Sequence, residues 1–100
     1  MNPALMHFLD SLLRLNYHIT ITSAYRTPEQ NKAAGGVPTS QHLKGEAIDF
    51  KPYGSTTYNQ LLLYILDNVE YDQFIIYNGF MHISFSSRNR HQLIDKRKNL

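Results

Sequence analysis

The sequence contains no cysteine, which limits both how the chain can be crosslinked and how it can hold a metal. Disulfides and thiolate ligands are excluded, so any metal must be bound by histidine and carboxylate side chains. There is no run of about 20 apolar residues, the length that a membrane-spanning helix needs. The first residues, Met1-Asn2-Pro3, lack the basic segment of a secretory signal. We therefore expect a soluble chain that is cytoplasmic at synthesis.

The length and charge of the chain predict one domain. With 100 residues, 42% of them hydrophobic, the chain can bury a core without crosslinks. The first 87 residues carry five basic and seven acidic side chains, whereas those after residue 87 carry five basic and one acidic. We expect a domain over residues 1–90 and a basic tail over 91–100. The tail could favour an anionic wall polymer or nucleic acid, but a solvated terminal segment explains it at least as well.

Nucleic-acid binding is not expected. Recognition of single strands uses aromatic side chains among basic ones, and no Phe, Tyr or Trp follows Arg88.

Hydrophobic periodicity predicts an α+β fold, a small antiparallel sheet flanked by helices. Asn2 and Pro3 form a cap and first-turn pair, so a helix is expected over about residues 3–15. Its apolar positions recur at helical spacing and should face the core: Leu5, Phe8, Leu9, Leu12 and Leu13. Further helices are expected over about residues 28–34 and 57–68, and strands over 19–23, 47–50, 73–77 and 80–85.

The last two strands are joined by Asn78-Gly79, a strong hairpin signal. A two-residue turn places Tyr77 opposite Phe80 and His82 opposite the residue at position 75. Tyr77 would then lie diagonally from His82, within reach of a metal bound there.

Three side chains are candidate metal ligands: His42, Asp49 and His82. Two imidazoles and one carboxylate form an N,N,O set that leaves a fourth tetrahedral position open for water, as in catalytic zinc sites. Spacing alone does not establish this, because His and Asp often occur seven residues apart by chance. His82 taken alone fits a buried core histidine better than a ligand.

The surrounding sequence supplies a more specific signal. It consists of three segments, Ser23-Ala24-Tyr25-Arg26, Ser40-x-His42-x-x-Gly45-x-Ala47-x-Asp49 and Met81-His82-Ile83-Ser84. In this order, from about residue 19 to about residue 90, they closely resemble the zinc D-Ala-D-Ala carboxypeptidase family. That family includes bacterial wall peptidases and many phage endolysins, and hedgehog signalling domains share its fold.

The resemblance implies a role for each matched residue. His42, Asp49 and His82 would bind Zn²⁺, which polarises the scissile carbonyl and lowers the pKa of water. Arg26 would pair with a substrate carboxylate or the developing oxyanion, although an arginine at a strand end can also be a surface cation.

The same resemblance suggests roles for four further residues. Ser40 and Gln41 match positions that line the substrate site, and Ser40 could equally be a cap. The sequence departs from the family at the general base, because Tyr77 stands where a Glu is usual. Asp72 matches a common family Asp but falls on the opposite strand face. Tyr77 and Asp72 are therefore the catalytic candidates, and the base stays unassigned.

The function that the resemblance implies is zinc-dependent cleavage of a peptidoglycan stem peptide, at a D-Ala-D-Ala or L-Ala-D-Glu linkage. We expect a monomer that serves as a phage or prophage lysis protein. The alternative is a zinc-stabilised binding module without catalysis, because the usual carboxylate base is absent.

Overall fold

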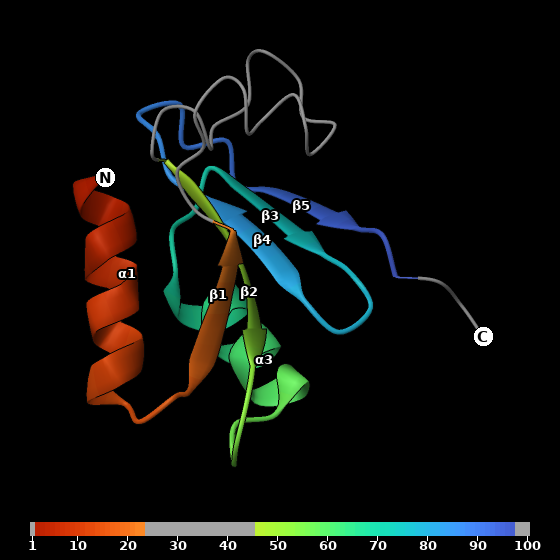
Figure 1. Ribbon diagram of the computed structural model, residues 1–100. Helices are drawn as coiled ribbons and strands as arrows, with labels where there is room; N and C mark the ends of the chain where they lie inside the picture. The colour runs from red at the N-terminus through yellow and green to blue at the C-terminus, as the bar shows by residue number, and fades with distance from the viewer. Residues whose placement is uncertain (1, 24–45, 98–100) are drawn as a thin grey trace.

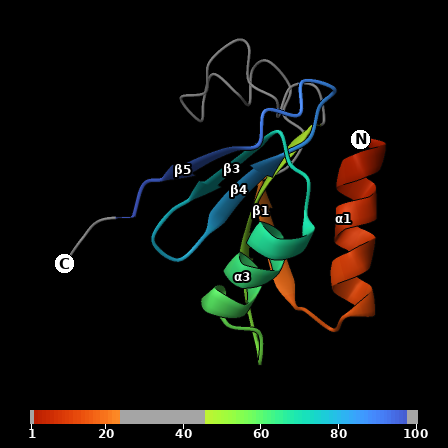
Figure 2. The same ribbon diagram turned by 180° about the vertical axis from the view of Figure 1, so that it is seen from behind.

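The computed structural model describes residues 2–23 and 46–97, and over these ranges the chain forms a five-stranded sheet with two helices. The elements are α1 (Pro3–Arg14), β1 (Ile19–Ser23), β2 (Ala47–Pro52), α3 (Tyr58–Asn68), β3 (Gln73–Ile76), β4 (Met81–Ser84) and β5 (Gln92–Asp95). The strand order is β1-β2-β4-β3-β5. Both helices pack against one face of the sheet and leave the other face for the site (Figures 1 and 2).

The expected α+β fold is confirmed, with one difference in the sheet. Strands β1, β2, β4 and β3 pair antiparallel, but β5 joins β3 in parallel, so the sheet is mixed. The helix expected over about residues 28–34 lies outside the described residues. Within the described part of the chain, neither helix has the length and apolarity needed to cross a membrane.

Helix α1 begins as its sequence predicts. The side-chain oxygen of Asn2 accepts hydrogen bonds from the backbone N–H groups of Ala4 (2.8 Å) and Leu5 (3.3 Å). These bonds satisfy donors that have no partner within the helix. The expectation that Leu13 faces the core is wrong, because its exposed fraction is 74% while Leu12 is buried. Successive residues of a helix point about 100° apart, so only one of these two leucines can face the sheet.

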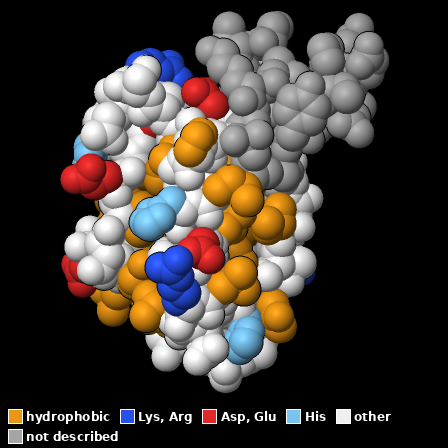
Figure 3. Space-filling model, turned by 90° about the vertical axis from the view of Figure 1, so that its left-hand side faces the viewer, with side chains coloured by type: hydrophobic (Ala, Val, Ile, Leu, Met, Phe, Trp, Pro, Cys, Tyr) orange, Lys and Arg blue, Asp and Glu red, His pale blue; other side chains and the backbone are white. Residues whose placement is uncertain are grey.

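Leu13 belongs to an apolar surface beside α1. Hydrophobic side chains gather on this face of the molecule (Figure 3), where a groove of about 370 Å³ runs between α1 and β1. Its lining residues are Met6, Leu9, Leu12, Leu13, Tyr17, His18, Ile19, Ile21 and Tyr53. The apolar stripe of α1 is therefore wider than the part covered by the sheet.

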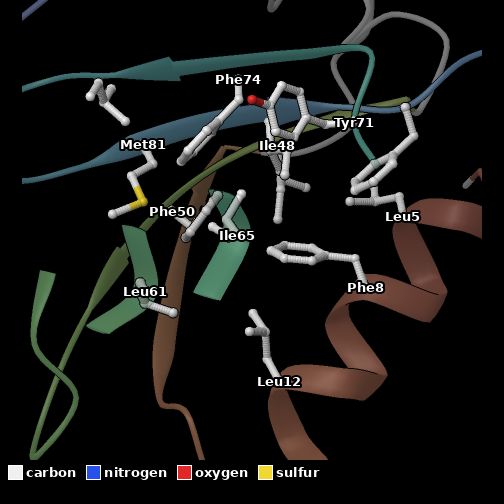
Figure 4. Packing of buried hydrophobic residues seen from close by; sticks show 13 residues of the cluster. Leu5, Phe8, Leu12, Ile48, Phe50, Leu61, Ile65, Tyr71, Phe74 and Met81 are labelled. Atoms are coloured by element: carbon white, nitrogen blue, oxygen red, sulfur yellow. The ribbon is translucent and has the colours of Figure 1, made fainter. Parts of the chain in front are cut away.

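The core lies between the helices and one face of the sheet (Figure 4). The buried side chains of the cluster are Leu5, Phe8, Leu12, Ile48, Phe50, Leu61, Ile65, Tyr71, Phe74, Ile76, Met81, Ile83 and Phe85. In β2, Ile48 and Phe50 have no exposed surface, whereas Asp49 between them is only half-buried. Strand alternation thus sends Asp49 to the face opposite the helices, as expected.

The β3–β4 hairpin has the register that its turn sequence predicts. Ile75 pairs with His82, and the backbone N–H of Tyr77 donates to the carbonyl of Phe80 at 3.0 Å. Gly79 adopts a positive φ of 84°, the left-handed region that glycine enters without steric cost. The turn therefore fixes which residues of β4 face the site.

Strand β5 is formed by residues that we expected in a basic tail. It pairs with β3 from Gln92 to Asp95. The carboxylate of Asp95 accepts two hydrogen bonds from the guanidinium of Arg97 (3.0 and 2.8 Å). Hydrogen bonds from Arg97 lower the pKa of Asp95 from 3.8 to about 2. The C-terminal segment thus continues the sheet as its edge strand as far as Asp95.

Candidate active site

The site is built on the sheet face opposite the helices, where two of the three candidate ligands lie side by side. Asp49 of β2 is the direct cross-strand partner of His82 of β4. The distance between Asp49 Oδ1 and His82 Nδ1 is 2.8 Å. The side chains are 18% and 14% exposed, respectively, so both reach solvent at one edge. The sheet therefore presents a carboxylate and an imidazole as an adjacent, partly buried pair.

The geometry of this pair fits two ligands of one zinc ion. Zinc–nitrogen and zinc–oxygen bonds of about 2.0–2.1 Å at tetrahedral angles place two ligand atoms about 3.3 Å apart. The Asp49–His82 distance is 2.8 Å, so a small side-chain shift would bring both atoms to that spacing. A carboxylate and a neutral imidazole are ligands that zinc accepts. Among the described residues no group of three such side chains is assembled.

The remaining ligand and the substrate candidates lie outside the described residues. They are His42, Arg26, Ser40 and Gln41, all within residues 24–45. Their assignments stay predictions from the sequence.

Tyr77 is close enough to the Asp49–His82 pair to feel the charge of Asp49. Its ring stacks on the ring of Phe80, with centroids 4.4 Å apart and planes 4° apart. Burial raises the pKa of the Tyr77 phenol above its ordinary value of 10.0, and the negative charge of Asp49 raises it further. The phenol therefore keeps its proton at neutral pH and can donate a hydrogen bond, but it is not suited to act as a base.

The backbone at Tyr77 is held from the helix layer. The hydroxyl of Tyr58 on α3 donates to the carbonyl oxygen of Tyr77 at 2.7 Å. This bond ties the end of β3 to the helix that packs beneath it, so the position of the Tyr77 backbone is fixed from two sides.

Asp72, the other catalytic candidate, is engaged by arginine. Its side chain has no exposed surface, and the guanidinium of Arg90 donates to both carboxylate oxygens at 2.9 and 3.0 Å. The backbone N–H of Arg90 adds a third bond at 3.0 Å. Arg88 lies farther away, at 3.4 Å. These contacts are those of an ion pair that anchors the segment before β5, and the catalytic role of Asp72 stays a prediction.

Comparison with known protein families agrees with this geometry. Residues 2–84 match the family model described as peptidase M15. The chain belongs to the peptidase M15 family. The matched range contains both described ligand candidates and covers all strands except β5. A search of curated proteins found no match. The resemblance to the zinc D-Ala-D-Ala carboxypeptidase family is thereby confirmed, and membership supports a peptidase activity for this M15 domain.

Two features of the M15 domain were missed by the sequence interpretation. One is the pairing of Asp72 with Arg90, and the other is the addition of β5, which brings Lys96 to the site face. The apolar signal in β5 is only Leu93-Ile94, too short to predict a strand. The sequence did contain a signal for the ion pair, because Asp72 is followed by a cluster of basic residues that begins at Arg88.

Proposed function

We propose that this M15 domain is a zinc-dependent peptidase that cleaves a peptide bond in bacterial peptidoglycan. The observation that supports it best is the Asp49–His82 pair, placed at 2.8 Å on the sheet face opposite the helices. By the family motif, D-Ala-D-Ala and L-Ala-D-Glu linkages are the leading substrates. Stem peptides of the wall would thus be its partners.

Each residue of the proposed site has a chemical task. Asp49 and His82, with His42 from residues 24–45, would hold the zinc ion. When bound, zinc supplies a Lewis acid that polarises the scissile carbonyl. Tyr77 would donate its proton to a hydrogen bond with the carbonyl oxygen as negative charge develops there. Arg26, with Ser40 and Gln41 beside it, would orient the substrate.

The test is to incubate the zinc-loaded protein with purified cell wall and to search for new peptide termini by mass spectrometry. We expect new termini with the wild type and none with His82→Ala. His7→Ala is the matched control, because His7 is exposed on α1. New termini that persist undiminished in His82→Ala would refute the assignment.

One observation favours a second candidate, a zinc-stabilised binding module without catalysis. Of the two catalytic candidates, Asp72 is occupied by Arg90 and Tyr77 has a raised pKa, so neither is suited to take a proton at neutral pH. A wild-type protein that binds zinc and cell wall but releases no peptide would establish this module instead.

The proposed setting is lysis by a phage or prophage. An enzyme of this kind made in the cytoplasm would reach the wall through a pore formed by another protein, or after lysis. Addition of the protein from outside to permeabilised cells, followed by the fall in turbidity, would test this setting.

A further inference from the structure

The edge strand β5 brings a lysine to the face that carries His82. Ile94 of β5 pairs with Ile75, which is itself the cross-strand partner of His82. Because side chains alternate along a strand, Lys96 shares the face of Ile94. The backbone N–H of Lys96 donates to the carbonyl of Ile76 at 2.8 Å, which fixes this end of the strand against β3.

The side chain of Lys96 turns toward the site. Its Nζ atom lies 6.0 Å from the centroid of the Tyr77 ring, a distance at which an aromatic face attracts a cation. Tyr77 stacks on Phe80, and the charge of Asp49 acts on its phenol. The Tyr77 ring is thus close to the ammonium group of Lys96 and within the electrostatic influence of Asp49.

The charge of Lys96 is available to a ligand. The adjacent carboxylate, Asp95, is bound by Arg97. Over residues 2–23 and 46–97, no carboxylate lies within ion-pair distance of Lys96. Lys51, two residues beyond Asp49 on the same face of β2, is likewise unpaired in that part of the chain. Two exposed lysines therefore flank the site, and their positive potential favours an anionic ligand.

The sheet geometry sets the distance of this charge from the metal ligands. One strand, β3, separates β5 from β4. Neighbouring strands lie about 4.8 Å apart, and Lys96 is two residues along the strand from Ile94, so the backbone of Lys96 is roughly 12 Å from that of His82. An extended peptide advances about 3.3 Å per residue, so this separation corresponds to about three or four residues.

We propose that Lys96 is a specificity-determining residue, an inference that rests on the peptidase function proposed above. It binds a carboxylate of the substrate about three or four residues from the bond that is cut. The M15 domain is therefore selective for acidic peptides, with Tyr77 supporting the ammonium group.

The test uses two peptides that differ only in whether that carboxylate is free or is a carboxamide. For the wild type, we expect the free acid to have a KM lower by roughly two- to fivefold, the usual range for an exposed ion pair. In Lys96→Gln the KM values for the two peptides become equal, and Lys96→Arg restores the preference. Arg14→Gln is the matched control, since it removes one exposed positive charge on α1, on the helix side of the sheet, and keeps the preference.

The preference for the free acid should also weaken when the salt concentration is raised from roughly 0.05 to 0.5 M, because dissolved ions screen interactions between exposed charges. Equal KM values for the two peptides in the wild type overturn the proposal, as does a preference that survives in Lys96→Gln.

A binding measurement distinguishes failure of the peptidase function from failure of the carboxylate site at Lys96. If neither peptide is cleaved, the affinities of the zinc-loaded protein for both are measured by calorimetry. A stronger affinity for the free acid that depends on Lys96 supports the carboxylate site although catalysis fails. Equal affinities, or a difference that Lys96→Gln leaves unchanged, overturn it.

Discussion

Tyr77 carries an O–H donor near the Asp49–His82 pair, and its surroundings keep that proton in place at neutral pH. Burial and the charge of Asp49 both raise its pKa above 10.0. We predict that Tyr77→Phe lowers kcat on the order of 100-fold with little change in KM, because the lost hydrogen bond forms mainly in the transition state. Steady-state kinetics on a peptide substrate measures this. Tyr53→Phe, at an exposed tyrosine, should have no effect, and an unchanged kcat in Tyr77→Phe would remove Tyr77 from the chemistry.

The pair formed by Asp95 and Arg97 predicts a dependence of stability on pH. The pKa of Asp95 is lowered from 3.8 to about 2 in the folded chain. A lowered pKa means that the pair stabilises the fold at pH values above 3.8 and that this contribution is lost as the pH falls toward 2. Titration of the Asp95 carboxyl carbon by NMR measures the pKa directly. In Arg97→Gln it should return to near 3.8, and a midpoint near 3.8 in the wild type would show that the pair does not form.

Single residues of the site could be predicted from the sequence only where a motif names them. The motif named Asp49 and His82 as candidates, and strand alternation correctly predicted that Asp49 lies on the face opposite the core. Their 2.8 Å contact could not be predicted, because β2 and β4 are joined by a helix and a strand rather than a turn. Their register is set by long-range packing, which local sequence does not encode.

At the scale of elements, the turn of the β3–β4 hairpin controls the position of His82. Gly79 has a φ of 84°, Asn78 is not among the residues with positive φ, and nothing lies within 4 Å of a Cβ built at Gly79. We predict that Gly79→Ala lowers the free energy of unfolding by about 1–2 kcal/mol, through backbone strain rather than a clash. Urea denaturation measures the change. Ser55→Ala, at an exposed turn residue without a positive φ, is the control and should cost less than about 0.5 kcal/mol, so equal losses in the two variants would contradict this account.

The segment between β4 and β5 is anchored by the buried carboxylate of Asp72. Truncation of Arg90 would remove both guanidinium hydrogen bonds from that fully buried charge, while the backbone N–H at position 90 (3.0 Å) and the longer contact to Arg88 (3.4 Å) would stay. We predict that Arg90→Ala lowers the free energy of unfolding by about 2–4 kcal/mol. Arg88→Ala should cost less than about 1 kcal/mol, because its contact is longer and exposed. Thermal unfolding of the two variants provides the comparison. If Arg88→Ala loses as much stability as Arg90→Ala, Arg90 is not the main partner of Asp72.

The helices and the first four strands follow from local signals, whereas β5 does not. Caps, a helical apolar stripe, β-branched alternation and an Asn-Gly turn are all local features. Strand β5 has one apolar pair and is recruited by hydrogen bonds to β3 and by Asp72, whose carbonyl accepts from the N–H of Gln92 at 3.0 Å. An edge strand held by tertiary contacts leaves little trace in its own sequence.

At the scale of the whole molecule, the sheet separates the core from the site. The helices and the buried cluster occupy one face, and Asp49, His82 and Tyr77 occupy the other. Substitutions of the site residues therefore leave the main cluster intact. This separation makes it possible to measure metal binding through stability without confusing it with loss of the core.

Zinc should stabilise the folded chain in proportion to its affinity. A ligand at 100 times its Kd that binds only the folded state adds about 2.7 kcal/mol. For a chain of this size, such a gain raises Tm by roughly 10–20 °C. We predict that a chelator lowers the Tm of the zinc-loaded wild type by that amount and leaves the Tm of His82→Ala almost unchanged, because the variant lacks one of the proposed ligands. Differential scanning calorimetry, with metal analysis of the same samples, measures both. A wild-type Tm that does not respond to the chelator, in samples shown to contain one zinc per chain, would mean that the metal is bound somewhere other than the Asp49–His82 pair.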